Sequence, residues 1–180
     1  SAFYALALDS GARLRELAGL TWTDVNLETR CVRIARQLLP GSSEKPAWGP
    51  TKSGRGREVV VTPETLSRLR DLKRQQAELK FRNRLRYKDF GLVFAKEHAH
   101  CRRANDNLGQ PLQLNNLNEK GREFSRLMES ANVRRIRFHG LRHTCAILAL
   151  AHGERITDVA ERLGHSKVSM TLDIYSHATH

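Results

Sequence analysis

Residues 138–153 read Phe-His-Gly-Leu-Arg-His-Thr-Cys-Ala-Ile-Leu-Ala-Leu-Ala-His-Gly and predict a largely buried helix. The apolar run that begins at Cys145 indicates burial, and the final glycine is typical of the residue after a helix. His139 and Arg142 are three positions apart, so they project from one face of this helix. A buried arginine needs a partner, and the start of a helix favours an anion. We therefore expect an anion, such as a ligand phosphate, beside these two side chains.

Helices are predicted for most of the remaining chain, from apolar residues at helical spacing and from capping residues. The predicted helices span residues 3–9, 13–19, 63–79, 114–132, 157–163 and 169–175. Thr62 is the expected N-cap of the helix that begins at Pro63. The expected inward side chains of the 114–132 helix are Leu117, Phe124, Leu127 and Met128.

Two segments rich in β-branched residues, 31–35 and 58–62, predict strands that pair in a hairpin or small sheet. Between them, residues 40–57 contain many prolines and glycines, and residues 80–91 are charged, so both stretches are predicted to be turns or loops. The order is helix, small sheet, then mostly helix, which indicates one α+β domain that is mainly α.

The composition favours a polyanionic partner. The 180 residues carry 31 Lys+Arg against 19 Asp+Glu, a formal charge of +12 with a pI near 10.4. Neutralising phosphates releases counterions, so such a surplus favours nucleic acid. No apolar run approaches the ~20 residues of a membrane span. Three cysteines lie far apart and are odd in number, which argues for a reducing compartment rather than a disulfide framework.

Four residues from separate segments complement His139 and Arg142 chemically. They are Arg13, Lys52, His165 and Tyr175. An arginine can place a fork on two phosphate oxygens, and lysine and histidine can move protons. A phenol with a pKa near ~10 becomes a useful nucleophile when cations or a base assist it. The set as a whole suits attack on a phosphodiester.

Each of these residues also has an ordinary explanation when it is considered alone. Arg13 could pair with Glu16, three positions along a helix. His165 could be solvated in a turn, Tyr175 could pack on the core, and Arg142 could be a surface charge. The joint occurrence and the local sequence contexts favour the chemical explanation.

The segment around Lys52 is rich in cations, because Arg55 and Arg57 follow it closely. A solvated basic turn is one interpretation. The other is a hairpin whose three cations close over a DNA backbone, and on this interpretation Arg55 and Arg57 are DNA-binding residues. His143 lies about 100° around the helix from Arg142, so we interpret it as structural.

Six strings carry a resemblance to a known family. They are SGARLREL (10–17), LTWTDV (20–25), TKSGRGREV (51–59), HGLRHT (139–144), LGHS (163–166) and TLDIYSH (171–177). In this order they resemble the tyrosine recombinase (phage integrase) family over nearly the whole chain. Ser10 departs from the threonine that the family often has. The resemblance implies a catalytic domain in which a small antiparallel sheet or β-hairpin packs on a helical bundle.

The resemblance also implies a role for each of the six residues. Tyr175 would attack the scissile phosphate to form a 3′-phosphotyrosyl intermediate, and Arg13 and Arg142 would clamp the non-bridging oxygens. Lys52 would act as general acid on the leaving 5′ oxygen. His139 would take part in proton transfer, and His165 would hydrogen-bond the phosphate. The implied function is site-specific recombination or integration of DNA, for a phage or mobile element.

Cofactors and partners follow from the same resemblance. The family's chemistry needs no metal and no other cofactor. The expected partner is double-stranded DNA, bound by a homo-tetramer of the full-length protein, with the isolated domain monomeric and no membrane contact. The expected location is the bacterial cytoplasm, at the nucleoid. Residues 1–180 are expected to be the catalytic domain alone, without the N-terminal core-binding domain and with both ends truncated.

Other functions remain open from the sequence alone. A non-cleaving DNA-binding module of the same fold would bind DNA without a covalent adduct. A type IB topoisomerase-like strand transferase would relax supercoiled DNA, and a phosphomonoesterase would act on small phosphates. His98, His100 and Cys101 could suggest zinc, but they offer three clustered ligands where structural sites need four, so no metal site is predicted.

Overall fold

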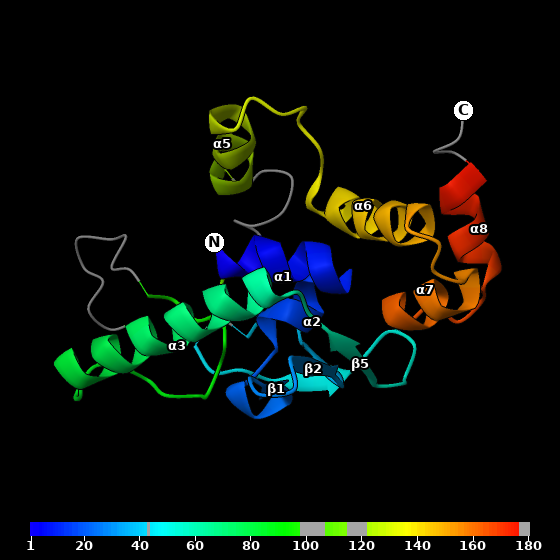
Figure 1. Cartoon of the computed structure of the whole chain (residues 1–180). Helices are drawn as coiled ribbons and strands as arrows, with labels where there is room; N and C mark the ends of the chain where they lie inside the picture. Colours follow the sequence, from blue (N-terminus) through cyan, green and yellow to red (C-terminus); the bar gives the residue numbers. More distant parts are fainter. Residues whose placement is uncertain (43, 98–106, 115–121, 177–180) are drawn as a thin grey trace.

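The structure of the chain is a computed structural model that describes residues 1–42, 44–97, 107–114 and 122–176 (Figure 1). The N-terminal part holds α1 (Ala2–Ser10), α2 (Leu14–Ala18), a 3-10 turn η1 (Trp22–Asp24), β1 (Val25–Asn26), β2 (Cys31–Ile34), β3 (Arg36–Leu38), β4 (Trp48–Pro50), β5 (Arg57–Val60) and α3 (Pro63–Arg82). The C-terminal part holds α5 (Arg122–Ser130), α6 (Phe138–Ala151), α7 (Ile156–Leu163) and α8 (Ser169–Ser176). The predicted α+β class, mainly α, is confirmed.

The main sheet has the order β1-β2-β5, and both pairings are antiparallel. The predicted pairing of the two β-branched segments is confirmed, with Val32 opposite Val59 and both side chains buried. Their neighbours Arg33 and Glu58 are also paired but face solvent. This alternation lets one face of the sheet cover the core while the other remains polar.

A second sheet joins β3 to β4, with Arg36 opposite Pro50 and Leu38 opposite Trp48. The prediction of turns throughout residues 40–57 is wrong for this short strand. Proline lacks an N–H group but can occupy an edge strand, and Pro50 belongs to such a two-stranded pair. The indole Nε1 of Trp48 also donates to the carbonyl oxygen of Gly19 at 2.8 Å, which ties β4 to the end of α2.

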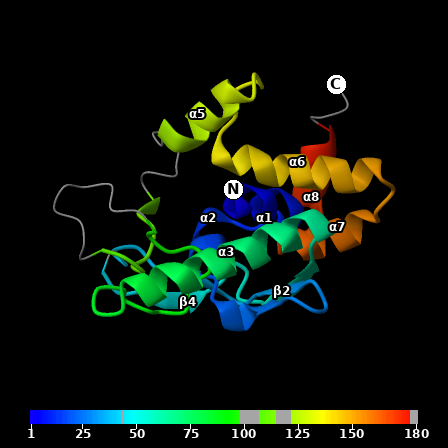
Figure 2. The ribbon, with the colours of Figure 1, turned by 60° about the vertical axis from the view of Figure 1, so that its left-hand side comes forward.

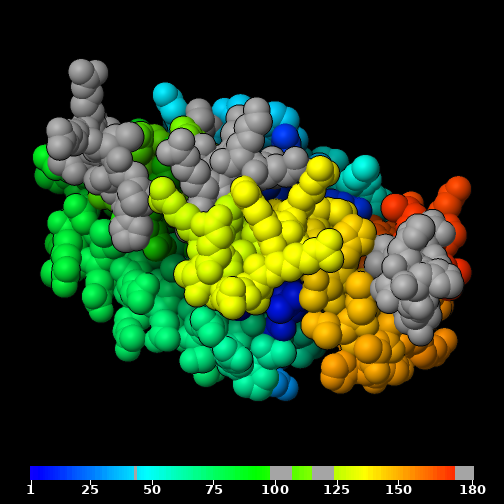
Figure 3. Space-filling view, turned by 90° about the horizontal axis from the view of Figure 1, so that it is seen from above, coloured from blue at the N-terminus to red at the C-terminus, as the bar shows by residue number. Residues whose placement is uncertain are grey.

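The core is built around α1, whose Phe3, Leu6 and Ala7 are buried. Helix α1 contacts α3 on one side and α6 on another, and it lies between them in both ribbon views (Figures 1 and 2). From above, the N-terminal residues, coloured blue, appear only as small patches between the elements that cover them (Figure 3). The hydrophobic start of the chain thus joins the sheet side of the molecule to the C-terminal helices.

Helix α3 begins as predicted. Thr62 accepts a hydrogen bond from the N–H of Thr65 at 3.3 Å, and Pro63 is the first helical residue. The helix continues to Arg82, three residues beyond the prediction, because residues 80–82 are compatible with a helix although they are charged. Buried Gln76 holds its middle in place by accepting a hydrogen bond from the indole of Trp22 at 2.8 Å.

The C-terminal helices agree closely with the sequence. Helices α6, α7 and α8 match the predicted ranges to within a residue or two. In α5, Phe124 and Met128 are buried as predicted, but Leu127 is 43% exposed, so that part of the prediction is wrong. Leu127 lies on the flank of the stripe that the other two form. Leu117 lies outside the described residues.

None of the described helices is long and apolar enough to cross a membrane.

Candidate active site

Arg142 is buried in α6, with 3% of its surface exposed. Its Nη1 donates to the carbonyl oxygen of Gly11 at 2.6 Å, and its Nη2 donates to that of Leu163 at 2.5 Å. These backbone acceptors are neutral, so they orient the guanidinium without cancelling its charge. Burial lowers the pKa of Arg142 to about 9, and the charges of Arg13 and Arg57 act in the same direction. The side chain is therefore a fixed cation at neutral pH.

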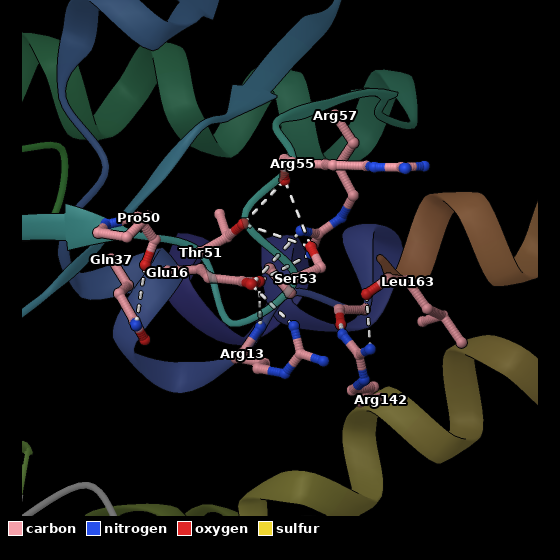
Figure 4. A network of polar contacts seen from close by, with 12 residues as sticks. Arg13, Glu16, Gln37, Pro50, Thr51, Ser53, Arg55, Arg57, Arg142 and Leu163 are labelled. Atoms are coloured by element: carbon pink, nitrogen blue, oxygen red, sulfur yellow. Dashed lines mark hydrogen bonds and ion pairs between the residues drawn. The ribbon is translucent and has the colours of Figure 1, made fainter. Parts of the chain in front are cut away.

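Arg13 precedes α2 and donates two hydrogen bonds to the carboxylate of Glu16. Its backbone N–H donates to Oε2 of Glu16 at 2.9 Å, and its Nη1 donates to Oε1 at 3.0 Å. The i,i+3 pair that the sequence offers as the ordinary explanation of Arg13 is therefore present. Because 21% of the Arg13 side chain remains exposed, the pairing does not remove its guanidinium from the surface. Figure 4 shows the two side chains at the centre of a wider polar network.

Arg57 is the residue whose position differs most from the sequence expectation. It starts β5, and its side chain is 4% exposed, so it cannot close over a DNA backbone from the hairpin surface. Its Nη2 pairs with Oε2 of Glu16 at 2.7 Å, and its Nε donates to the carbonyl oxygen of Arg162 at 2.6 Å. Buried Glu16 attracts the guanidinium inward, which the basic pattern of the hairpin does not reveal. We therefore correct the assignment of Arg57 as a DNA-contacting residue.

Lys52 and Arg55 do lie on the exposed hairpin turn between β4 and β5. The hydroxyl of Thr51 donates to the carbonyl oxygen of Arg55 at 2.8 Å and fixes the shape of the turn. The side chain of Arg55 points away from the network (Figure 4). Lys52 is close enough to His139 for its charge to lower the pKa of that imidazole.

A pocket of about 130 Å³ opens between the start of α2 and the start of α6. It is lined by Ala12, Arg13, Leu14, Arg137, Phe138, His139 and Arg142. Three of the six predicted residues, Arg13, His139 and Arg142, thus line one small pocket. Cations converging on a concave site favour an anionic ligand.

His139 lies in the first turn of α6, edge-on to His143, with ring centroids 4.8 Å apart. Desolvation lowers the pKa of His139, and the charges of His143, Arg142, Arg13 and Lys52 lower it further. The imidazole is therefore neutral at pH 7, which leaves it able to accept a proton.

His165 follows Gly164, the left-handed residue that ends α7. Its Nδ1 lies 2.8 Å from the hydroxyl oxygen of buried Thr171. Desolvation lowers the pKa of His165 to about 4, and the charge of Arg142 is the next largest cause. In the tautomer whose Nδ1 accepts from Thr171, Nε2 carries a proton that it can donate to an anion.

Tyr175 lies in α8, which contacts both α6 and α7. The backbone of this residue is described, whereas its side chain lies outside the described part of the chain. The helix that carries the candidate nucleophile is thus packed on the two elements that carry Arg142, His139 and the turn of His165.

Sequence reasoning missed three contributors to the site. Arg137 lines the pocket, Thr171 contacts His165, and the carbonyl oxygen of Gly11 receives Arg142. Glycine at 11 has a positive φ of 58°, and the turn that it forms was the one visible signal. No sequence pattern marks Arg137 as a pocket residue or pairs Thr171 with His165.

Within the described ranges, no three histidine, cysteine, aspartate or glutamate side chains gather as metal ligands. The candidate zinc residues His98, His100 and Cys101 lie outside those ranges.

Comparison with known proteins now decides the family. The whole chain, residues 1–180, matches the sequence model of the phage integrase family. The chain belongs to the phage integrase family. The resemblance predicted from the six strings is confirmed.

Two curated relatives match nearly the whole of this chain. A tyrosine recombinase XerC-like protein of Caldanaerobacter subterraneus subsp. tengcongensis is 28% identical over 188 residues, covering 98% of this chain and 45% of that protein. The transposase of transposon Tn916 of Enterococcus faecalis is 30% identical over 182 residues, covering 97% of this chain and 41% of that protein. The chain thus spans less than half the length of either relative.

Two solved structures of integrases share the fold of this chain. The integrase of transposon Tn1549, in complex with a circular intermediate DNA, matches with a TM-score of 0.70 at 22% identity, over 96% of this chain and 52% of that one. The catalytic domain of bacteriophage HP1 integrase matches with a TM-score of 0.55 at 21% identity, over 98% of this chain and 73% of that one. The predicted fold of a recombinase catalytic domain is confirmed.

Proposed function

We propose that residues 1–180 form the catalytic domain of a site-specific DNA recombinase, which breaks and rejoins strands through a covalent bond to Tyr175. The observation that carries this proposal is the convergence of Arg13, Arg142 and His139 on one pocket. Helix α8, which bears Tyr175, packs against the same helix α6. Family membership and the DNA complex of the related Tn1549 integrase support the choice of DNA as substrate.

In the proposed reaction, the phenol oxygen of Tyr175 attacks the scissile phosphorus. A bond forms between that oxygen and phosphorus, and the bond from phosphorus to the 5′ oxygen breaks. Neutral His139 takes part in removing the phenol proton, and Lys52 protonates the leaving 5′ oxygen. The products are a 3′-phosphotyrosyl bond and a free 5′-hydroxyl. Reversal with a different 5′-hydroxyl rejoins the strands, and the covalent bond conserves the energy, so no nucleotide is consumed.

Arg13 and Arg142 bind the non-bridging oxygens in this scheme, where negative charge grows in the transition state. His165 donates a hydrogen bond to the same phosphate from Nε2. All of the positive charge comes from side chains, and no metal or other cofactor takes part. Arg55, exposed on the hairpin beside Lys52, would contact the neighbouring DNA backbone.

The direct test replaces the nucleophile. Tyr175→Phe removes one oxygen, so it should abolish covalent protein–DNA adducts while DNA binding persists. Nicked suicide duplexes with a randomised core would trap adducts of the unchanged protein, which denaturing gels separate from free DNA. Tyr87→Phe is a matched control, because Tyr87 lies just beyond the C-terminal end of α3 and is not among the residues that line the pocket. Adducts that survive Tyr175→Phe would rule out the assignment.

The same assay separates the alternatives. A non-cleaving module of this fold would bind the duplexes and yield no adduct with any variant. A type IB topoisomerase-like enzyme would form the adduct and also relax supercoiled plasmid without pairing two sites. The randomised core would also reveal the target sequence from the trapped DNA.

We propose further that the full-length protein acts on double-stranded DNA at the bacterial nucleoid as a homo-tetramer, while the isolated domain is a monomer. Sedimentation of the protein with and without the recovered target duplex would measure this. A single protein copy per duplex pair under conditions that support strand exchange would contradict the tetramer.

A further inference from the structure

A buried carboxylate lies directly behind the proposed phosphate-binding arginine. Glu16 is 1% exposed, and both of its carboxylate oxygens accept hydrogen bonds. Oε1 receives Nη1 of Arg13 at 3.0 Å and Nη1 of Arg57 at 3.4 Å. Oε2 receives the backbone N–H of Arg13 at 2.9 Å and Nη2 of Arg57 at 2.7 Å. Two guanidinium groups therefore share one carboxylate.

The two arginines differ in what else they can reach. Arg57 is almost fully buried, and its Nε donates to the carbonyl oxygen of Arg162. Arg13 keeps 21% of its side chain exposed and lines the pocket. The buried Arg57 thus bonds only within the protein among the described residues, whereas the partly exposed Arg13 lines the pocket where an anion would bind.

The charges explain why two arginines are needed. Glu16 with Arg13 alone would form a neutral pair, and a second anion would have to compete with the carboxylate for the same guanidinium. With Arg57 present, the three side chains sum to one positive charge. Burial alone would raise the pKa of Glu16, but its bonds to Arg57 and Arg13 hold the pKa below the ordinary value, so the carboxylate stays ionised.

Arg57 also reaches the segment that carries His165. Its Nη1 lies where a side chain on Gly164 would have to go, 3.0 Å from the position of a Cβ there. Its bond to Arg162 holds a carbonyl oxygen at the C-terminal end of α7, where the helix dipole favours a cation. One buried guanidinium therefore joins α2 to the turn that presents His165.

We propose that Arg57 is a positioning residue that neutralises Glu16, so that the guanidinium of Arg13 is left to bind a phosphate. This inference rests on the proposed function for its DNA substrate, although phosphate binding itself can be measured without cleavage. It predicts that the loss of phosphate binding caused by removing the charge of Arg57 is reversed when the charge of Glu16 is removed as well.

The experiment compares the unchanged chain with Arg57→Gln, Glu16→Gln and the double variant. Binding of inorganic phosphate is measured from the shift of the thermal midpoint at constant ionic strength. Adduct formation on the suicide duplexes is measured in parallel. Arg57→Gln should weaken phosphate binding and slow adduct formation by about tenfold or more, which is less than the ~10²-fold lost when an oxyanion-stabilising donor is removed outright, because Arg13 itself is still present. The double variant should recover to within about threefold of the unchanged chain.

A purely structural role predicts the opposite for the double variant, because it loses both halves of a buried ion pair. If the double variant binds phosphate as weakly as Arg57→Gln, or more weakly, the proposal is overturned. Absence of any phosphate effect on the unchanged chain would overturn it as well. Arg74→Gln, which breaks a surface pair with Asp71, is the control and should change neither readout.

Arg57→Lys covers the case in which Arg57→Gln does not fold. Lysine keeps the charge and loses the fork, so phosphate binding should stay within about threefold of the unchanged chain. A folded Arg57→Lys protein with phosphate binding as weak as that of Arg13→Gln would contradict neutralisation. Failure of the proposed function is distinguishable, because it abolishes adducts in the unchanged chain and leaves the pattern of phosphate binding intact.

Discussion

At the scale of single residues, Arg142 combines a structural and a chemical role. It joins two carbonyl oxygens that lie 131 and 21 residues away along the chain, and it lines the pocket. A lysine has the same charge but no planar fork, so it cannot hold both carbonyl oxygens and also face a phosphate.

We therefore expect Arg142→Lys to slow adduct formation on the order of 10²-fold, comparable to the loss of an oxyanion-stabilising donor. Rates of adduct formation on suicide duplexes measure this directly. Arg68→Lys, at an exposed pair with Glu64, is the matched control and should behave as the unchanged chain. Cleavage by Arg142→Lys within threefold of normal would contradict the clamp.

The histidines give the fold a dependence on pH. The pKa of His165 is lowered from 6.5 to about 4, chiefly by desolvation, and those of His139 and His143 are lowered for the same first reason. The unfolded chain therefore binds more protons than the folded chain between these values. The free energy of unfolding should be greatest above pH 6.5 and should fall as the pH decreases from 6.5 towards 4.

Urea unfolding at a series of pH values measures this dependence. His165→Gln should flatten part of the decline, because glutamine does not titrate. Saturating inorganic phosphate should also reduce the decline, because an anion beside His165 favours its protonated form. A decline that is identical with and without His165 would show that other groups cause it.

At the scale of elements, the end of α7 depends on Gly164. This residue has a φ of 66°, and a Cβ there would lie 3.0 Å from Nη1 of Arg57. Gly153, which follows α6, has a φ of 84° and no atom within 4 Å of the position of a Cβ. Alanine would strain the backbone at both glycines, but only at Gly164 would its methyl group also press on Arg57. Comparing the two substitutions therefore distinguishes backbone strain from the close contact.

Gly153→Ala should cost about 1–2 kcal/mol in the free energy of unfolding, the cost of a left-handed alanine. Gly164→Ala should cost more than Gly153→Ala, because the methyl group also displaces Arg57, and only Gly164→Ala should slow adduct formation. Urea unfolding and the adduct assay measure the two effects. Equal effects of the two changes on both readouts would argue that Arg57 tolerates displacement.

At the scale of the whole molecule, the net charge of +12 predicts binding to DNA that depends strongly on salt. If the chain neutralises about six phosphates, its affinity for duplex DNA should fall about 10³-fold between 50 and 200 mM salt. Fluorescence anisotropy with labelled duplexes at several salt concentrations gives the slope. An affinity that is independent of salt would contradict a backbone-contacting interface.

Much of the fold could be predicted, because its signals are local. The spacing of apolar residues marked the helices at 138–152, 157–163 and 169–175, and Thr62 with Pro63 marked the start of α3. The errors arose where tertiary contacts override local preference. Strand β4 forms in a stretch rich in proline and glycine because β3 lies beside it, and Leu127 is exposed because it lies off the buried stripe.

The sequence by itself determined the identity of the six candidate residues and the family, because residue types at fixed short spacings belong to the chain and need no folding. Only the tertiary structure decided which basic side chains are buried in ion pairs and which remain exposed to bind a ligand. Arg55 and Arg57 look alike in the sequence, yet Arg55 points into solvent while Arg57 is buried against Glu16. The physical reason is that a buried carboxylate must be neutralised. The cation that neutralises Glu16 lies 41 residues away along the chain, so only the folded structure shows which one it is.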